Sequence, residues 1–135
     1  MLPSGLPERL ADDEPLARFL TSDSHFNSTM PKPAAFLPGP IDSKTSVFRQ
    51  NPDPRQALWE TADLQIGPER RARAAAMLSA SAVRQCQLDV EAYEPPPRHA
   101  NIIGWPNIAN DVELTRAQRK GFALRLAQVA ELVRR

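Results

Sequence analysis

The sequence predicts a small α+β domain. The stretch SKTSVFRQ at 43–50 is rich in the β-branched and aromatic residues that favour strands. LDVEAY at 88–93 alternates apolar and acidic side chains, as a half-buried strand does, whereas residues 111–135 carry apolar side chains at helical spacing. A chain of 135 residues is the usual size of one domain. We therefore expect a single α+β domain over residues 12–135, preceded by a flexible lead-in at 1–11.

The first elements expected along the chain are a helix and a strand. DDEPLARFLTS predicts a helix near 13–21, because acidic residues precede its first turn and Leu16, Phe19 and Leu20 fall on one helical face. The following segment is too rich in proline and short polar residues for a helix, although its AAFL sequence is compatible with a brief edge strand. TSVFR at 45–49 predicts the first regular strand.

A second helix is expected near 54–64, within DPRQALWETADLQIG. Asp53 suits the N-cap, and Pro54 suits the first helical position, where its missing N–H costs nothing. Gly67 follows the apolar positions and favours an end to the helix.

The alanine-rich segment 68–88 has two interpretations. Its high helix propensity favours one long helix, whereas serines in its middle are possible N-caps and allow a strand near 72–78 followed by a helix near 80–87. We prefer the second, because 88–93 has the pattern of a strand and a strand, helix, strand order then follows.

The last two expected elements are a strand at 99–103 and a helix over 112–134. The prolines of EPPP form a rigid connector, since a residue that precedes proline is held out of the helical region. HANII follows them as the strand. The helix is amphipathic, because its apolar residues fall on one helical face at Leu114 and then, three or four positions apart, at Phe122, Leu126, Val129 and Val133. The predicted architecture is therefore a small sheet of about four short strands packed with about four helices.

Composition limits the possible environments and partners. The net charge of +1 gives the chain as a whole no strong attraction to DNA or membranes. Its N-terminal end is acidic and its C-terminal end is basic, which favours either contact between the two ends or a protein partner. Cys86 is the single cysteine, which excludes an internal disulfide. No apolar run approaches the roughly 20 residues that span a bilayer. We expect a cytoplasmic protein with no membrane partner.

Three polar clusters carry the candidate site residues: SDSHF at 22–26, TSVFR at 45–49 and PRHANI at 97–102. His25 and His99 are the candidate catalytic residues, because histidine exchanges a proton near neutral pH. Arginine binds anionic oxygens bidentately, so convergence of the clusters predicts a phosphate-ester or nucleotide site. The candidate binding residues are Arg49, Arg98, Ser22, Ser46, Asn101 and Trp105.

The same residues also have structural interpretations. His25 suits a loop histidine bonded to a backbone carbonyl, and Arg49 suits an ion pair with Asp42 or Asp53. Arg98 and His99 suit solvated positions at the entrance of a strand. The two sets of interpretations differ in whether the clusters meet.

Several kinds of site find no support in the sequence. There is no G-x-S-x-G, and Ser24 beside His25 is not on the sharp turn that a serine nucleophile needs. Five glycines in all do not build a Walker or dinucleotide loop. The histidines, the cysteine and the acidic residues lack zinc-site spacing. We therefore expect no metal and no cofactor.

Two further functions remain as hypotheses. RNA binding would use the basic side of the C-terminal helix or RRAR at 70–73, with Trp59, Trp105 and Tyr93 as stacking groups. The absence of a complete catalytic motif favours instead an accessory or interaction protein, such as a subunit of a multi-protein system.

The blocks RFLTSDSHF, TSVFR and EPPPRHANIIGWP together resemble a group of small bacterial proteins of unknown function. The resemblance spans roughly residues 10–133 and implies a complete, single-domain bacterial protein. It implies no activity.

Overall fold

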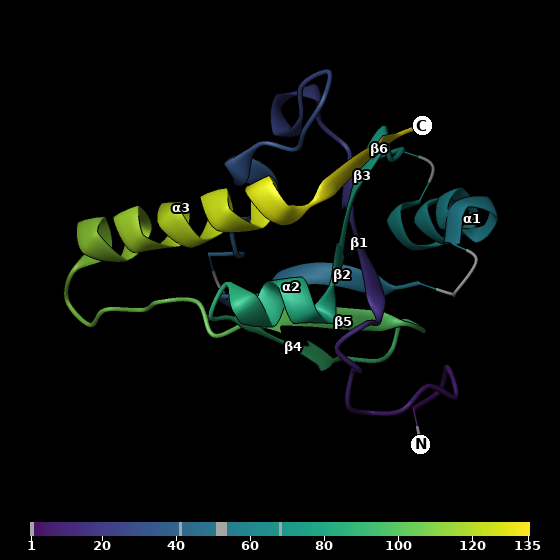
Figure 1. The fold of residues 1–135 in the computed structure, drawn as a ribbon, viewed down its shortest axis with the longest axis horizontal. Helices are drawn as coiled ribbons and strands as arrows, with labels where there is room; N and C mark the ends of the chain where they lie inside the picture. The colour runs from purple at the N-terminus through teal and green to yellow at the C-terminus, as the bar shows by residue number, and fades with distance from the viewer. Residues whose placement is uncertain (1, 41, 51–53, 68) are drawn as a thin grey trace.

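A six-stranded antiparallel sheet forms the centre of the protein (Figure 1). The structure, a computed structural model, describes residues 2–40, 42–50, 54–67 and 69–135, without the side chains of 54–56. In these residues the strand order is β4–β5–β2–β1–β3–β6. The strands are β1 (Pro15–Leu20), β2 (Thr45–Arg49), β3 (Ala74–Ser79), β4 (Asp89–Ala92), β5 (His99–Ile103) and β6 (Glu131–Arg134).

Helices cover both faces of the sheet. The described residues form three α-helices, α1 (Pro54–Ile66), α2 (Ala80–Gln85) and α3 (Val112–Val129). Two short 3₁₀ turns, η1 (Asp23–His25) and η2 (Pro33–Phe36), lie between β1 and β2 in the sequence. In Figure 1, α1 lies on one side of the sheet, and α2 and α3 lie on the other.

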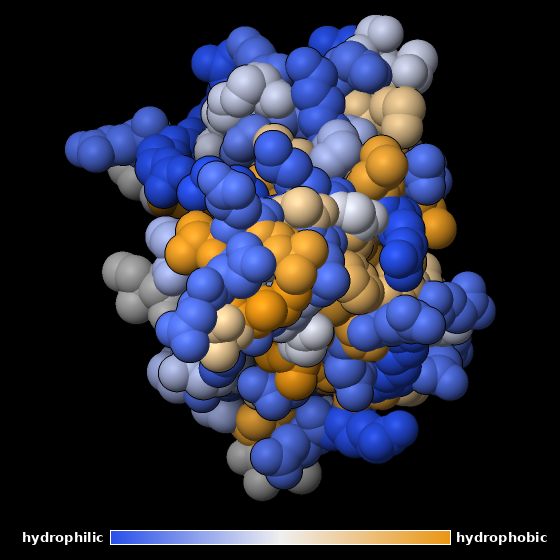
Figure 2. All heavy atoms as spheres, turned by 90° about the vertical axis from the view of Figure 1, so that its left-hand side faces the viewer, coloured by the Kyte–Doolittle hydropathy of each residue, from blue (hydrophilic) through white to orange (hydrophobic). Residues whose placement is uncertain are grey.

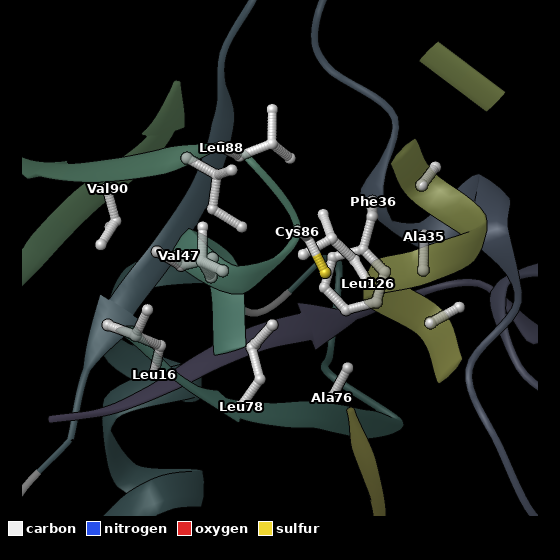
Figure 3. Packing of buried hydrophobic residues seen from close by; sticks show 14 of the residues in the cluster. Leu16, Ala35, Phe36, Val47, Ala76, Leu78, Cys86, Leu88, Val90 and Leu126 are labelled. Carbon is white, nitrogen blue, oxygen red and sulfur yellow. The ribbon is translucent and has the colours of Figure 1, made fainter. Parts of the chain in front are cut away.

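Each covered face has its own apolar core. The larger core packs α2, α3 and η2 against the sheet, and Figure 3 shows Cys86 of this core pointing toward Phe36 and Leu126. The smaller core packs Leu58 and Ala62 of α1 against the opposite face. Strands β1 and β3 therefore contribute to both cores, which agrees with their nearly continuous apolar sequences, PLARFL and AAAMLS.

The predicted helix at 13–21 is wrong, because residues 15–20 form the strand β1. The strand pairs with β2 on one side and with β3 on the other. Leu16 and Leu20 point into the larger core, whereas Ala17 and Phe19 point into the smaller one. Two-sided burial places apolar residues at nearly consecutive positions, which also satisfies a helical pattern.

The predicted C-terminal helix is too long. It begins as expected, since Asp111 caps it by accepting a hydrogen bond from the Leu114 backbone N–H at 2.9 Å. It ends at Val129, and β6 then pairs with β3. The paired residues of β3 lie 54 to 60 positions earlier in the chain. This long-range pairing supplies the hydrogen bonds of β6, and no local sequence pattern predicts it.

The predicted architecture of four strands and four helices is therefore wrong, although the structure is α+β. The described residues contain six strands and three α-helices. The preferred interpretation of the alanine-rich segment, a strand followed by a helix, is confirmed: the strand is β3 and the helix is α2. The AAFL segment belongs to η2 and is not a strand. The proposed cap Asp53 lies outside the described residues.

The residues that precede β1 lie against the sheet end and α2. Leu10 is buried in the larger core, and Ser4 donates hydrogen bonds to the Glu94 carboxylate from its N–H at 2.8 Å and its hydroxyl at 2.6 Å. Arg84 of α2 binds the Leu10 carbonyl oxygen and the Asp12 carboxylate.

Within the described part of the chain, no helix is long and apolar enough to cross a membrane.

Candidate functional site

Arg18 lies where β1 and β2 separate. The two strands pair at Leu16–Arg49 and Ala17–Phe48. At the next position, Arg18 donates from Nη1 to the Ser46 carbonyl oxygen at 2.9 Å and from Nε to the Ala35 carbonyl oxygen at 2.9 Å. The guanidinium thus bridges β2 and η2, and its two backbone bonds hold it beside Ser46.

A cavity of about 350 Å³ opens beside this guanidinium, between the ends of β1 and β2, the C-terminal end of α1 and the turn η1. Phe19, Phe48 and Ile66 form part of its apolar wall. Among the described residues, no acidic side chain lines it. Its polar lining consists of Arg18, Arg70, His25, His99, Ser46, Thr21 and Gln65.

Ser46 and His99 form a hydrogen-bonded pair in this cavity. The distance from Ser46 Oγ to His99 Nε2 is 2.6 Å, and His99 Nδ1 lies 2.8 Å from the Tyr93 carbonyl oxygen. A carbonyl only accepts, so Nδ1 carries a proton in this geometry, and in the neutral ring Nε2 accepts the Ser46 hydroxyl proton. The imidazole is therefore held in the tautomer that acts as a base toward Ser46.

The sheet register brings this pair together. Ser46 is opposite Asn101 and Phe48 is opposite His99 in the β2–β5 ladder, so Ser46 and His99 are diagonal neighbours on one face. The Phe48 ring packs against the imidazole with their centroids 5.3 Å apart. The position of His99 is thus fixed by packing as well as by hydrogen bonds.

The turn η1 brings His25 to the same cavity. Ser22 caps this turn: its hydroxyl accepts from the Ser24 N–H at 3.2 Å, and its carbonyl accepts from the His25 N–H at 3.1 Å. Burial and the nearby positive charge of Arg18 lower the pKa of His25 below its ordinary value. The imidazole is therefore largely neutral at pH 7.

The cationic side chains of the cavity lack balancing carboxylates. Burial and the charge of Arg70 lower the pKa of Arg18. In the described residues, neither Arg18 nor Arg70 forms an ion pair, and Arg18 Nη2 makes no hydrogen bond. A largely buried cation without a counter-ion is unfavourable unless an anion neutralises it. The cavity is therefore suited to an anionic ligand.

Arg49, a predicted binding residue, lies elsewhere. Its side chain is fully buried and binds both carboxylate oxygens of Glu14, with Nη2 to Oε1 at 2.7 Å. Its Nη1 also donates to the Pro7 carbonyl oxygen at 2.7 Å. Arg49 therefore forms an ion pair, as its structural interpretation expected, but with Glu14 and not with Asp42.

Four more predicted binding residues are not part of the cavity lining. Ser22 caps η1 but does not line the cavity itself. Arg98 lines a separate cavity of about 450 Å³ with Gln50, and its Nη1 is buried without a hydrogen-bond partner among the described residues. Asn101 is buried in β5. Trp105 belongs to the larger core and donates from Nε1 to the Ile102 carbonyl oxygen at 3.2 Å.

Sequence reasoning missed Arg18 and Arg70, the two arginines of the cavity. Arg18 fell within the predicted helix at 13–21 and was not a candidate site residue, and Arg70 was named only within the basic run RRAR at 70–73. No spacing in the sequence joins them, because the cavity gathers segments that are far apart in the chain. Burial along β1 does not alternate, since its apolar residues are buried on both faces, so no local pattern singles out Arg18.

Comparison with known proteins yields no match: no family model, curated protein or solved structure is significantly similar to this chain. The resemblance of the three sequence blocks to small bacterial proteins therefore stays a prediction. In the described residues, no group of three or more His, Cys, Asp or Glu side chains is arranged to hold a metal ion. The functional argument depends on the geometry of the cavity.

Proposed function

We propose that the protein binds a small phosphate ester in the cavity of Arg18, His25, Ser46, Arg70 and His99. The observation that carries this proposal is the largely buried Arg18, which has backbone carbonyls as partners and no carboxylate among the described residues. Phosphate oxygens supply the missing acceptors and the missing negative charge. The proposal keeps both predicted histidines and replaces Arg49 and Arg98 by Arg18 and Arg70.

The size and walls of the cavity favour a small ligand that carries one ring. About 350 Å³ is near the lower end of the range for ligand pockets, roughly 300–1,000 Å³. Phe19 and Phe48 supply an aromatic wall, and Gln65 supplies an amide that donates and accepts hydrogen bonds. An aryl phosphate or a nucleoside monophosphate has this combination of features.

A matched pair of arginine variants tests the proposal. Arg70→Gln removes an exposed guanidinium from the cavity, whereas Arg71→Gln removes an exposed neighbour that does not line it. A charge-assisted hydrogen bond contributes about 1.5–3 kcal/mol, which corresponds to roughly 10- to 100-fold in affinity. We expect calorimetric titration with phenyl phosphate to give that loss for Arg70→Gln and a change within about three-fold for Arg71→Gln.

Two results would contradict the proposal. One is the absence of heat of binding for the unmodified protein at millimolar phenyl phosphate. The other is an equal loss of affinity in both variants, which would indicate general electrostatic attraction without a defined site.

A protein partner remains a second candidate because apolar side chains are exposed at the start of α3. Val112 is 71% exposed and Leu114 is 45% exposed. Figure 2 views the protein from the side on which α3 begins in Figure 1, and hydrophobic groups lie there among charged ones. A sedimentation experiment in which Val112→Ser leaves the association state unchanged would weaken this candidate.

RNA binding through the C-terminal helix has less support, since two of its basic groups make contacts within the protein. Arg119 donates to the Pro106 carbonyl oxygen at 2.8 Å, and the Arg125 guanidinium lies 4.8 Å from the centre of the Phe122 ring. Affinity for a single-stranded RNA that fell steeply with added salt would restore this candidate.

A further inference from the structure

We propose that Ser46 is a nucleophile that accepts the phosphoryl group of the bound ester, with His99 as its base. This inference rests on the proposed phosphate-ester site and adds a reaction to it. Three parts of a nucleophilic centre are present: a hydroxyl, an imidazole bonded to it, and a carbonyl that orients the imidazole. Here the orienting group is the Tyr93 backbone.

Arg18, the cation that would bind the phosphoryl group, is hydrogen-bonded to the backbone of Ser46, the residue that carries the hydroxyl. Arg18 Nη1 binds the carbonyl oxygen of Ser46, so a phosphoryl group on this guanidinium lies next to the Ser46 hydroxyl. The Arg18 and Arg70 charges neutralise the oxygens of the transferred group, which is the main electrostatic requirement of phosphoryl transfer. If the Ser46–His99 pair only stabilised the sheet, it would need neither a cavity beside it nor arginines without carboxylate partners.

In the first step, Ser46 Oγ attacks phosphorus and its proton passes to His99 Nε2. The Oγ–P bond forms while the bond from phosphorus to the ester oxygen breaks, and the released oxyanion takes a proton from solvent. The product of this step is an alcohol or phenol and a phosphoserine at position 46. No oxidant, metal or second substrate enters the balance.

In the second step, water attacks the phosphoserine. His25, which lines the same cavity as a largely neutral imidazole, takes a proton from the water. The Oγ–P bond breaks, and Ser46 Oγ recovers its proton from His99. Inorganic phosphate leaves, and His25 returns its proton to solvent, which balances the proton that the first product took.

The experiment incubates the full chain with p-nitrophenyl phosphate and follows both p-nitrophenol release and intact mass. His25→Asn should slow the second step, so we expect it to accumulate one phosphoryl group per chain, located on Ser46 by peptide mapping. Ser46→Ala should remove the label, and His99→Asn should slow p-nitrophenol release by about 10²- to 10⁴-fold. The control Ser81→Ala, on α2 across the sheet, should leave both readouts unchanged.

The outcomes separate this inference from the proposed function. Phenyl phosphate binding without label or p-nitrophenol release would overturn the inference and leave the binding site in place. A p-nitrophenol release rate that persists in Ser46→Ala would also overturn it, because another group would then carry the reaction. Absence of phenyl phosphate binding would overturn both.

Discussion

Substitution of Glu14 by glutamine tests the contribution of the most buried ion pair in the described residues. The Arg49 side chain is 0% exposed and that of Glu14 is 17% exposed, and two hydrogen bonds join them. Glutamine has nearly the same shape but no charge, so Arg49 would remain buried with only one side-chain acceptor and the Pro7 carbonyl oxygen. The substitution therefore isolates the loss of the negative charge.

The expected cost follows from this burial. Breaking a buried ion pair from one side costs about 3–5 kcal/mol, because the remaining charge loses its compensation. Retained acceptors and partial access of water to Glu14 place the expected loss near the lower limit, at about 3 kcal/mol. Since domains of this kind are stable by roughly 5–15 kcal/mol, the variant should fold but unfold at clearly lower urea concentration.

A second carboxylate provides the matched control. Asp12 pairs with Arg84, but its side chain is 75% exposed, so Asp12→Asn should cost at most about 1 kcal/mol. Urea unfolding followed by tryptophan fluorescence and circular dichroism gives both free energies. Equal losses in the two variants, or a loss below about 1 kcal/mol for Glu14→Gln, would refute the reasoning from burial.

Three further predictions concern the cavity and the larger core. Because burial and Arg18 lower the pKa of His25, its NMR titration midpoint should lie below the ordinary 6.5. Bound phosphate should raise this midpoint by offsetting the arginine charge. A midpoint that stays the same when phosphate is added would contradict phosphate binding beside His25. Leu126→Ala should lower the free energy of unfolding in urea by about 2–5 kcal/mol, because Leu126 is 0% exposed. Leu124 lies on the same helix but is 46% exposed, so Leu124→Ala should change that free energy by no more than about 0.5 kcal/mol. Similar losses in the two variants would argue against the packing of Leu126 in the core. Burial raises the pKa of the Cys86 thiol against the opposing charge of Arg125, so a disulfide reagent at pH 8 should modify it rapidly only after denaturation, and rapid modification of the folded protein would contradict its burial.

Much of the candidate site was within reach of sequence reasoning, but its arginines were not. The chain has two histidines, and both line the cavity together with Ser46. Arginine is common, and its role depends on what surrounds it. Arg49 meets Glu14 while Arg18 meets two backbone carbonyls, and neither environment follows from neighbouring residues in the sequence.

Local sequence determined the elements whose signals are local. β-branched and aromatic residues mark β2, alternation marks β4, and a capping aspartate marks the start of α3. Tertiary structure alone decided that residues 15–20 form a central strand and that the chain after Val129 returns to the sheet edge. Both strands obtain their hydrogen bonds from residues far along the chain, and the two-sided burial of β1 erases the alternation that identifies strands in a sequence. The cavity exists because β1 and β2 then separate beside Arg18, a long-range consequence of that pairing.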